Sequence, residues 1–152
     1  MFNFTVFGKV KAKQSVKIGR NGIKYTPADV KEYARTVKNS FLQAYPFWKA
    51  EWFESKHIMM CISVYAAIPQ SFTKKKFNEA VAGALRPAVK PDCDNIAKNI
   101  CDALNGVVYP DDKQIVHLLV TKQYTTGAER AEIEINVLDM CKEERLIRGL
   151  KE

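Results

Sequence analysis

The sequence has only four cysteines, and none of them belongs to a metal-binding or redox motif. They form no CxxC pair, so we expect no zinc site. A disulfide framework is also not expected in a chain of this size that lacks a secretory leader. The four cysteines are Cys61, Cys93, Cys101 and Cys141. We interpret all four as reduced thiols and expect two of them to lie in the core.

Long apolar runs are absent as well. No stretch approaches the ~20 residues that a membrane-spanning helix needs, and the N-terminal MFNFTVFGKV lacks the layout of a signal peptide. We therefore expect a cytoplasmic protein with no membrane partner. The 152 residues are enough for a proper core, and with no internal repeat or low-complexity segment we expect residues 1–152 to form one domain.

Acidic residues are outnumbered by basic ones. The chain has 24 Lys and Arg against 17 Asp and Glu, a net charge of +7, which suggests a polyanionic partner such as nucleic acid. Residues 9–24 contain no acidic residue, and we interpret them as a basic N-terminal arm that contacts phosphates. The alternative is a solvated basic loop. The basic residues of this arm are Lys9, Lys11, Lys13, Lys17, Arg20 and Lys24.

Periodicity predicts an α+β fold. The predicted strands cover residues 2–10, 57–68, 115–124 and 131–138, and the predicted helices cover residues 26–44, 71–82 and 94–104. A TTGA turn joins the last two strands, which we expect to pair as an antiparallel hairpin. The fold class is therefore a single compact domain with a mixed or antiparallel sheet packed against two or three helices. The charged tail 141–152 is expected to form a short helix or a loose end.

The second predicted helix carries three consecutive lysines, Lys74, Lys75 and Lys76. Three positive charges on one exposed turn can track a phosphate backbone. A solvated helix face explains them equally well.

Residues 90–114, KPDCDNIAKNICDALNGVVYPDDKQ, hold five of the seventeen acidic residues. Asp92 and Asp94 stand two apart at the start of the third predicted helix. Lys98 and Asp102 follow Asp94 at steps of four residues, so they share its helical face. Carboxylates gathered in a basic protein repel one another and gain nothing from packing, so we expect a divalent cation among them.

Asp111 and Asp112 come after a turn and can close this site from the other side of the helix. An oxygen-rich site without histidine or cysteine ligands suits Mg²⁺ or Mn²⁺, and Lys98 could stabilise a charged transition state or orient the attacking water. The structural alternatives are Asp94 as a helix cap and Asp111 as a turn residue. For Lys98 the alternative is an i,i+4 pairing with Asp94 and Asp102, worth only ~0.3–0.5 kcal/mol.

These motifs carry a family resemblance. KPDCDNIAKNICDALNG followed by YPDDKQIV resembles the signature of the RusA family of Holliday-junction resolvases, found largely in phages and prophages. The basic arm followed by Tyr25-Thr26-Pro27, and Lys122 two residues before Tyr124, are also similar to the family. The strong similarity is confined to roughly residues 90–116. The positions that match the signature are Lys90, Pro91, Asp92, Asp94, Asn95, Lys98, Asp102, Ala103, Leu104, Asn105, Gly106, Asp111 and Asp112.

The resemblance implies a small α+β homodimer that uses Mg²⁺ or Mn²⁺ to nick four-way DNA junctions symmetrically. The family's essential acids carry over onto Asp92, Asp94 and Asp112, and its essential lysine onto Lys98. Spacing alone does not choose between Asp111 and Asp112, but the resemblance chooses Asp112. The family positions that support the site are Asn95, linked to junction handling, and the acids Asp102 and Asp111.

The function favoured by the sequence is therefore a structure-selective endodeoxyribonuclease that resolves Holliday junctions by metal-dependent hydrolysis in DNA recombination and repair. Its expected partners are branched DNA and a second copy of the chain, in the cytoplasm of a bacterial host that carries phage or prophage genes. One alternative is a non-catalytic basic DNA-binding protein that assists recombination. Another is a metal-dependent nucleotide hydrolase, for which the basic arm would be superfluous.

Overall fold

The structure is a computed structural model of the chain, and it describes residues 1–13, 17–18 and 24–138. The predictions for Arg20 and for the tail 141–152 lie outside the described residues. For Lys17 and Lys24 the backbone is described and the side chains are not. No helix in the described ranges is long and apolar enough to cross a membrane.

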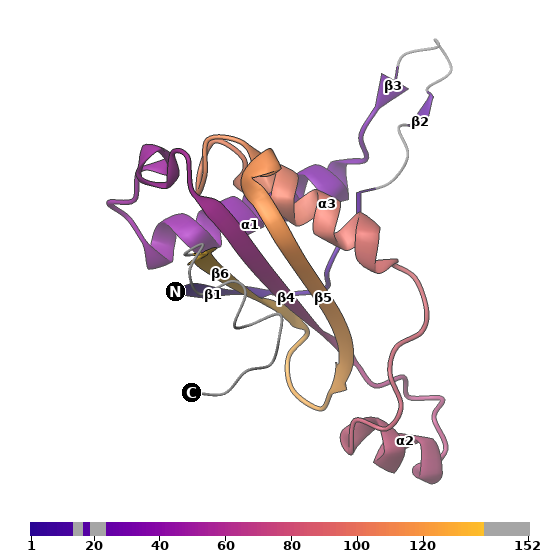
Figure 1. Cartoon of the computed structure of the whole chain (residues 1–152). Coiled ribbons are helices and arrows are strands. Elements are labelled where there is room, and N and C mark those ends of the chain that lie inside the picture. The colour runs from indigo at the N-terminus through magenta and orange to yellow at the C-terminus, as the bar shows by residue number, and fades with distance from the viewer. Residues whose placement is uncertain (14–16, 19–23, 139–152) are drawn as a thin grey trace, which may run out of the picture.

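Four strands form one mixed sheet in the order β1, β6, β4, β5 (Figure 1). Strand β6 is antiparallel to both β1 and β4, whereas β5 is parallel to β4. All four predicted strands are confirmed, within a few residues at their ends. Their bounds are Phe2–Phe7 for β1, His57–Ala67 for β4, Ile115–Thr125 for β5 and Arg130–Leu138 for β6.

The predicted hairpin of the last two strands is wrong. Strands β5 and β6 follow each other in the chain, but β4 lies between them and pairs with both: Met60 is opposite Leu118 on one side and Ile135 on the other. Residues 126–129 carry the chain past the end of β4. Strand β4 is apolar over most of its length, and its alternate side chains are buried in this interior position of the sheet. The turn sequence correctly predicted that the chain reverses between β5 and β6, but it did not predict that β4 lies between them.

Two helices cover one face of the sheet and build the core. Helix α1 (Ala28–Ala44) and helix α3 (Cys93–Leu104) pack against each other and lie side by side on the sheet in Figure 1. Each helix buries the face on which its apolar residues recur at helical spacing. Fully buried side chains from the helices and the sheet interlock here, among them Val37, Phe41, Ile96, Ile100, Leu104, Ile58, Met60, Ile62, Ile133 and Ile135.

Shorter elements complete the chain. Helix α2 (Lys74–Val81) begins after Thr73, whose hydroxyl accepts a hydrogen bond from Lys76 N–H at 3.4 Å. The predicted cap, Ser71, lies too early because α2 is shorter than expected. Two turns of 3₁₀ helix precede β4 and β5, and a two-stranded ribbon lies in the basic arm. Their bounds are Ala50–Phe53 for η1, Asp112–Gln114 for η2, Lys17–Ile18 for β2 and Lys24–Tyr25 for β3.

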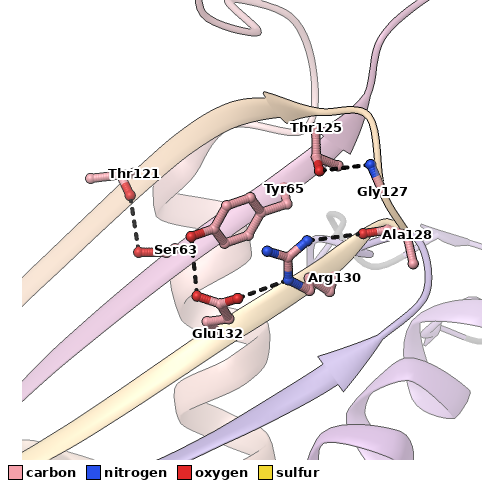
Figure 2. Close-up of polar contacts among 8 residues, drawn as sticks. All are labelled: Ser63, Tyr65, Thr121, Thr125, Gly127, Ala128, Arg130 and Glu132. Carbon is pink, nitrogen blue, oxygen red and sulfur yellow. Dashed lines mark hydrogen bonds and ion pairs between the residues drawn. The ribbon is translucent and has the colours of Figure 1, made fainter. Parts of the chain in front are cut away.

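The other face of the sheet carries a polar network of its own (Figure 2). Tyr65 Oη and Arg130 Nε donate hydrogen bonds to the Glu132 carboxylate at 3.1 and 2.8 Å, and the Arg130 guanidinium lies 3.8 Å from the centre of the Tyr65 ring. Thr121 donates to Ser63 across the β4–β5 pair. The charges of Arg130 and Glu132 are thus paired within the sheet, and we interpret this network as structural.

Candidate metal and DNA site

Helix α3 begins at Cys93, so Asp92 occupies the N-cap position directly before it. The backbone of Asp92 is extended, with φ −75° and ψ 148°, and its side chain makes no capping hydrogen bond. Asp94 lies in the first turn, where the helix dipole favours a carboxylate. The interpretation of Asp94 as the cap is therefore wrong. Asp92 stands in the capping position with its exposed carboxylate unused.

Lys98 and Asp102 lie on the exposed side of α3, as their spacing predicts. In the described part of the chain, Lys98 forms no ion pair with Asp94 or Asp102; Asp102 pairs instead with Lys13 of the basic arm. The i,i+4 pairing that offered a structural explanation for Lys98 is therefore not formed.

The two neighbouring aspartates after α3 have different surroundings. Asp111 caps η2: its carboxylate accepts a hydrogen bond from Lys113 N–H at 3.0 Å and pairs with Lys113 Nζ at 3.1 Å. The backbone hydrogen bond from Lys113 is the main reason why the pKa of Asp111 is lowered. Asp111 also forms a capping box with Gln114. The turn-residue interpretation of Asp111 is thus confirmed, whereas Asp112 is the first residue of η2 and not its cap.

Asp112 and Asp102 lie near the same part of α3. The pKa of the Cys101 thiol is raised to about 12, mainly by burial and to a smaller extent by the negative charges of Asp112 and Asp102. Tyr109 fixes this region, because its buried hydroxyl donates to the Cys101 carbonyl at 3.0 Å. Burial raises the pKa of Tyr109 as well, followed by the influence of Cys101 and then of the charges of Asp112 and Asp102. The turn after α3 therefore brings Asp112 back to the helix that carries the other acids.

The described end of the basic arm is bonded to the acidic helix. Lys13 N–H donates to the Asn95 carbonyl at 2.9 Å, and Asn99 Nδ2 donates to the Lys11 carbonyl at 2.7 Å. Lys11 Nζ also pairs with Asp29 of α1 at 3.2 Å. Asn99 is only 4% exposed although it is polar, and the sequence alone gives it no role. It was missed because its partner is a main-chain carbonyl far away in the sequence.

This contact creates a groove between the basic arm and the N-terminus of α3. Its volume is about 580 Å³. The walls combine lysines from the arm with Asp92 and Asn95, so the structure brings together positive charge for phosphates and a carboxylate. The lining residues are Lys9, Val10, Lys11, Ala12, Lys13, Lys90, Pro91, Asp92 and Asn95.

The acids do not form a closed metal cage. In the part of the chain that the structure describes, no three His, Cys, Asp or Glu side chains are arranged to hold a metal ion. The donor set of Asp92, Asp94 and Asp112 still fits Mg²⁺ or Mn²⁺: it contains carboxylates alone, and Asp92 makes no cap bond. Mg²⁺ is commonly held by one or two carboxylates and completed by water and substrate phosphates, so a closed cage is not required.

The three lysines of α2 do not reach this groove. Lys74, Lys75 and Lys76 are exposed, and α2 stands apart from α3 at the far end of the linker between them (Figure 1). Their predicted contact with DNA remains a prediction, as does that of Lys17, Arg20 and Lys24.

Comparison with known proteins identifies the family of the chain. Residues 6–136 match the family "Endodeoxyribonuclease RusA", and the chain belongs to this family. Membership implies an endodeoxyribonuclease with DNA as its substrate. The chain is also 34% identical over 143 residues to "Uncharacterized protein YqaN" of Bacillus subtilis (strain 168), a match that covers 90% of this chain and 95% of that protein.

Proposed function

We propose that the protein is a Mg²⁺- or Mn²⁺-dependent endonuclease that nicks four-way DNA junctions symmetrically. The observation that carries the proposal is the bonded contact between the basic arm and α3, which places arm lysines and Asp92 around one groove. A free-nucleotide hydrolase has no need for such a basic wall. Family membership supports DNA as the substrate.

Asp92, Asp94 and Asp112 would hold the metal ion. A bound Mg²⁺ supplies a Lewis acid for the phosphate and lowers the pKa of bound water. Asp112 is favoured over Asp111 because the carboxylate of Asp111 is engaged in capping η2. The family resemblance makes the same choice.

The protein's own cations would bind and orient the phosphate. Lys98 has no ion-pair partner in the described chain, so its ammonium can offset the charge that develops on the phosphate oxygens. Lys9 would hold a flanking phosphate along the groove. Lys11 and Lys13, which pair with Asp29 and Asp102, would bind phosphates with their remaining donors.

A homodimer accounts for symmetrical nicking. A junction offers two equivalent strands, and the described chain has one acidic stretch of this kind, so paired nicks require two chains. Two-fold symmetry presents one site to each strand.

The test is cleavage of a synthetic fixed four-way junction, compared with linear duplex, in the presence of Mg²⁺, Mn²⁺ or EDTA. Asp92→Asn, Asp94→Asn and Asp112→Asn should reduce nicking by about 100-fold or more while junction binding survives. Asp111→Asn is the matched control for Asp112→Asn, since asparagine also caps helices well.

Other outcomes would refute the assigned site or support one of the alternative functions. Undiminished nicking by the Asp92→Asn and Asp94→Asn variants would refute the assigned site. Junction binding without any metal-dependent nicking by the unmodified protein would support the non-catalytic accessory function. Turnover of free nucleotides alone would support the nucleotide hydrolase.

A further inference from the structure

A lysine from strand β5 holds the segment that leads into α3. Lys122 Nζ donates hydrogen bonds to the main-chain carbonyls of Val89, at 2.6 Å, and Pro91, at 3.0 Å. Pro91 directly precedes Asp92 in the chain. The ammonium therefore binds the backbone directly before Asp92, the first candidate metal ligand.

Lys122 is placed for this contact by the sheet. It pairs with Val64 in the β4–β5 ladder, and Val64 is buried, so the lysine side chain points to the face that the helices cover. It is half-buried and forms no ion pair within the described ranges. It lines a cavity of about 190 Å³. The apolar walls of this cavity include Pro87, Val89, Pro91 and Ile96.

The segment 87–91 has little else to fix it. Its described backbone makes a single further hydrogen bond, from Ala88 N–H at 2.9 Å, and Pro91 has no N–H to donate. The Asp92 side chain makes no capping bond that would hold it in place. Helix α3 fixes Asp92 from its C-terminal side, where the Asp92 carbonyl accepts a hydrogen bond from Ile96 N–H at 3.0 Å. On the N-terminal side, Lys122 is the side chain whose hydrogen bonds anchor the backbone to the sheet.

We propose that Lys122 is a positioning residue for the metal site: by binding the Val89 and Pro91 carbonyls it holds Asp92 where the carboxylate can join Asp94 around a divalent cation. The proposal rests on the proposed function, because it concerns the same site. Lys122 itself acts through the backbone and touches neither metal nor DNA.

The decisive measurement is a Mn²⁺ titration of the DNA-free protein, with free Mn²⁺ followed by electron paramagnetic resonance. Lys122→Met keeps the apolar stem and removes all three donors. We expect it to weaken Mn²⁺ binding by about tenfold or more, the usual effect of losing a residue that orients a ligand. The sign is diagnostic, because removal of a positive charge near carboxylates by itself strengthens cation binding. Unchanged or tighter Mn²⁺ binding would overturn the proposal.

Arg86→Met is the matched control. Arg86 anchors the same linker to the same strand, with Nη1 donating to Gln123 Oε1 at 3.1 Å, but it lies six residues before Asp92. We expect its Mn²⁺ affinity to remain that of the unmodified protein. A loss equal to that of Lys122→Met would mean that the whole linker, and not Lys122, sets the site.

A second readout guards against a variant that is merely unstable. Amide hydrogen exchange should become faster in residues 88–92 of Lys122→Met while α1 keeps its protection. Lys122→Arg, which restores the charge and the donors, should recover part of the Mn²⁺ affinity. Global loss of protection together with no recovery in Lys122→Arg would assign Lys122 a role in the core only and refute the proposal.

Asp92→Asn separates this proposal from the proposed function. If Asp92→Asn abolishes Mn²⁺ binding and Lys122→Met leaves it intact, the positioning role fails and the metal site stands. If Asp92→Asn leaves Mn²⁺ binding unchanged, the metal site itself is wrong, and the positioning role falls with it.

Discussion

Gln114 lies in the turn that contains Asp112, and its side chain bonds this turn to the loop before β4. Its Nε2 donates to the carbonyls of Phe53 and Lys56 at 2.6 and 3.0 Å, and its Oε1 accepts a hydrogen bond from Asp111 N–H at 3.3 Å. Methionine has a similar length and can make none of these bonds. Gln114→Met should therefore loosen η2 from its neighbour without creating a large cavity.

The size of the effect follows from the three lost bonds. A typical buried or half-buried hydrogen bond contributes about 0.5–1.5 kcal/mol net. Because Gln114 is half-buried, water can replace part of this, and we expect a loss of about 2–3 kcal/mol in the free energy of unfolding. For a domain of this size that corresponds to a fall in Tm of roughly 5–10 °C.

Thermal unfolding followed by circular dichroism measures this change. Gln43→Met is the matched control, since Gln43 is exposed on α1, and no hydrogen bond of its side chain is found in the described structure; its Tm should remain within about 1 °C of that of the unmodified protein. If Gln114→Met were as stable as Gln43→Met, the three contacts would contribute nothing, and the argument that Gln114 fixes the Asp112 turn would be refuted.

Two further predictions concern buried polar groups. Burial raises the pKa of Cys101 from an ordinary 9.0 to about 12 in the folded protein, so the unfolded thiol ionises first as pH rises. Cys101 should therefore contribute a loss of about 1.4 kcal/mol in stability between pH 8 and 10, and urea unfolding of Cys101→Ala should show a fall that is smaller by this amount. The Tyr33 hydroxyl is buried with no hydrogen-bond partner in the described chain, so Tyr33→Phe should raise the free energy of unfolding by about 1 kcal/mol. Tyr45→Phe should lower it instead, because Tyr45 Oη bonds to both main-chain groups of Asn3; equal effects of the two substitutions would contradict this reasoning.

Local periodicity was sufficient for much of the fold. The apolar arc of α3 and the alternating side chains of β6 follow from spacing alone, because each depends only on neighbouring residues. The order of the strands did not follow. The choice of β4 as the central strand depends on pairing between residues more than fifty positions apart, and a short turn between β5 and β6 is compatible with either arrangement.

The site divided in the same way. The motif gathered the candidate acids, and the family resemblance already preferred Asp112 to Asp111. The structure adds a physical reason for this preference, because the capping bonds of η2 engage the Asp111 carboxylate. Asn99 and Lys122 escaped functional assignment for a similar reason. Both bind main-chain carbonyls of distant segments. Because every residue has a main-chain carbonyl, the sequence does not show which one a side chain will bind.

Asp102 differs from the other acids of α3 because its charge already has a partner. Its ion pair with Lys13 is half-exposed, so it contributes little stability by itself. Together with the bonds from Asn99 to Lys11 and from Lys13 to Asn95, however, it makes a third link between the arm and the helix. These links fix the arm lysines relative to the acidic helix in the DNA-free protein, which would lower the ordering cost of the proposed DNA binding. We therefore interpret Asp102 as an anchor of the basic arm, with the metal left to Asp92, Asp94 and Asp112.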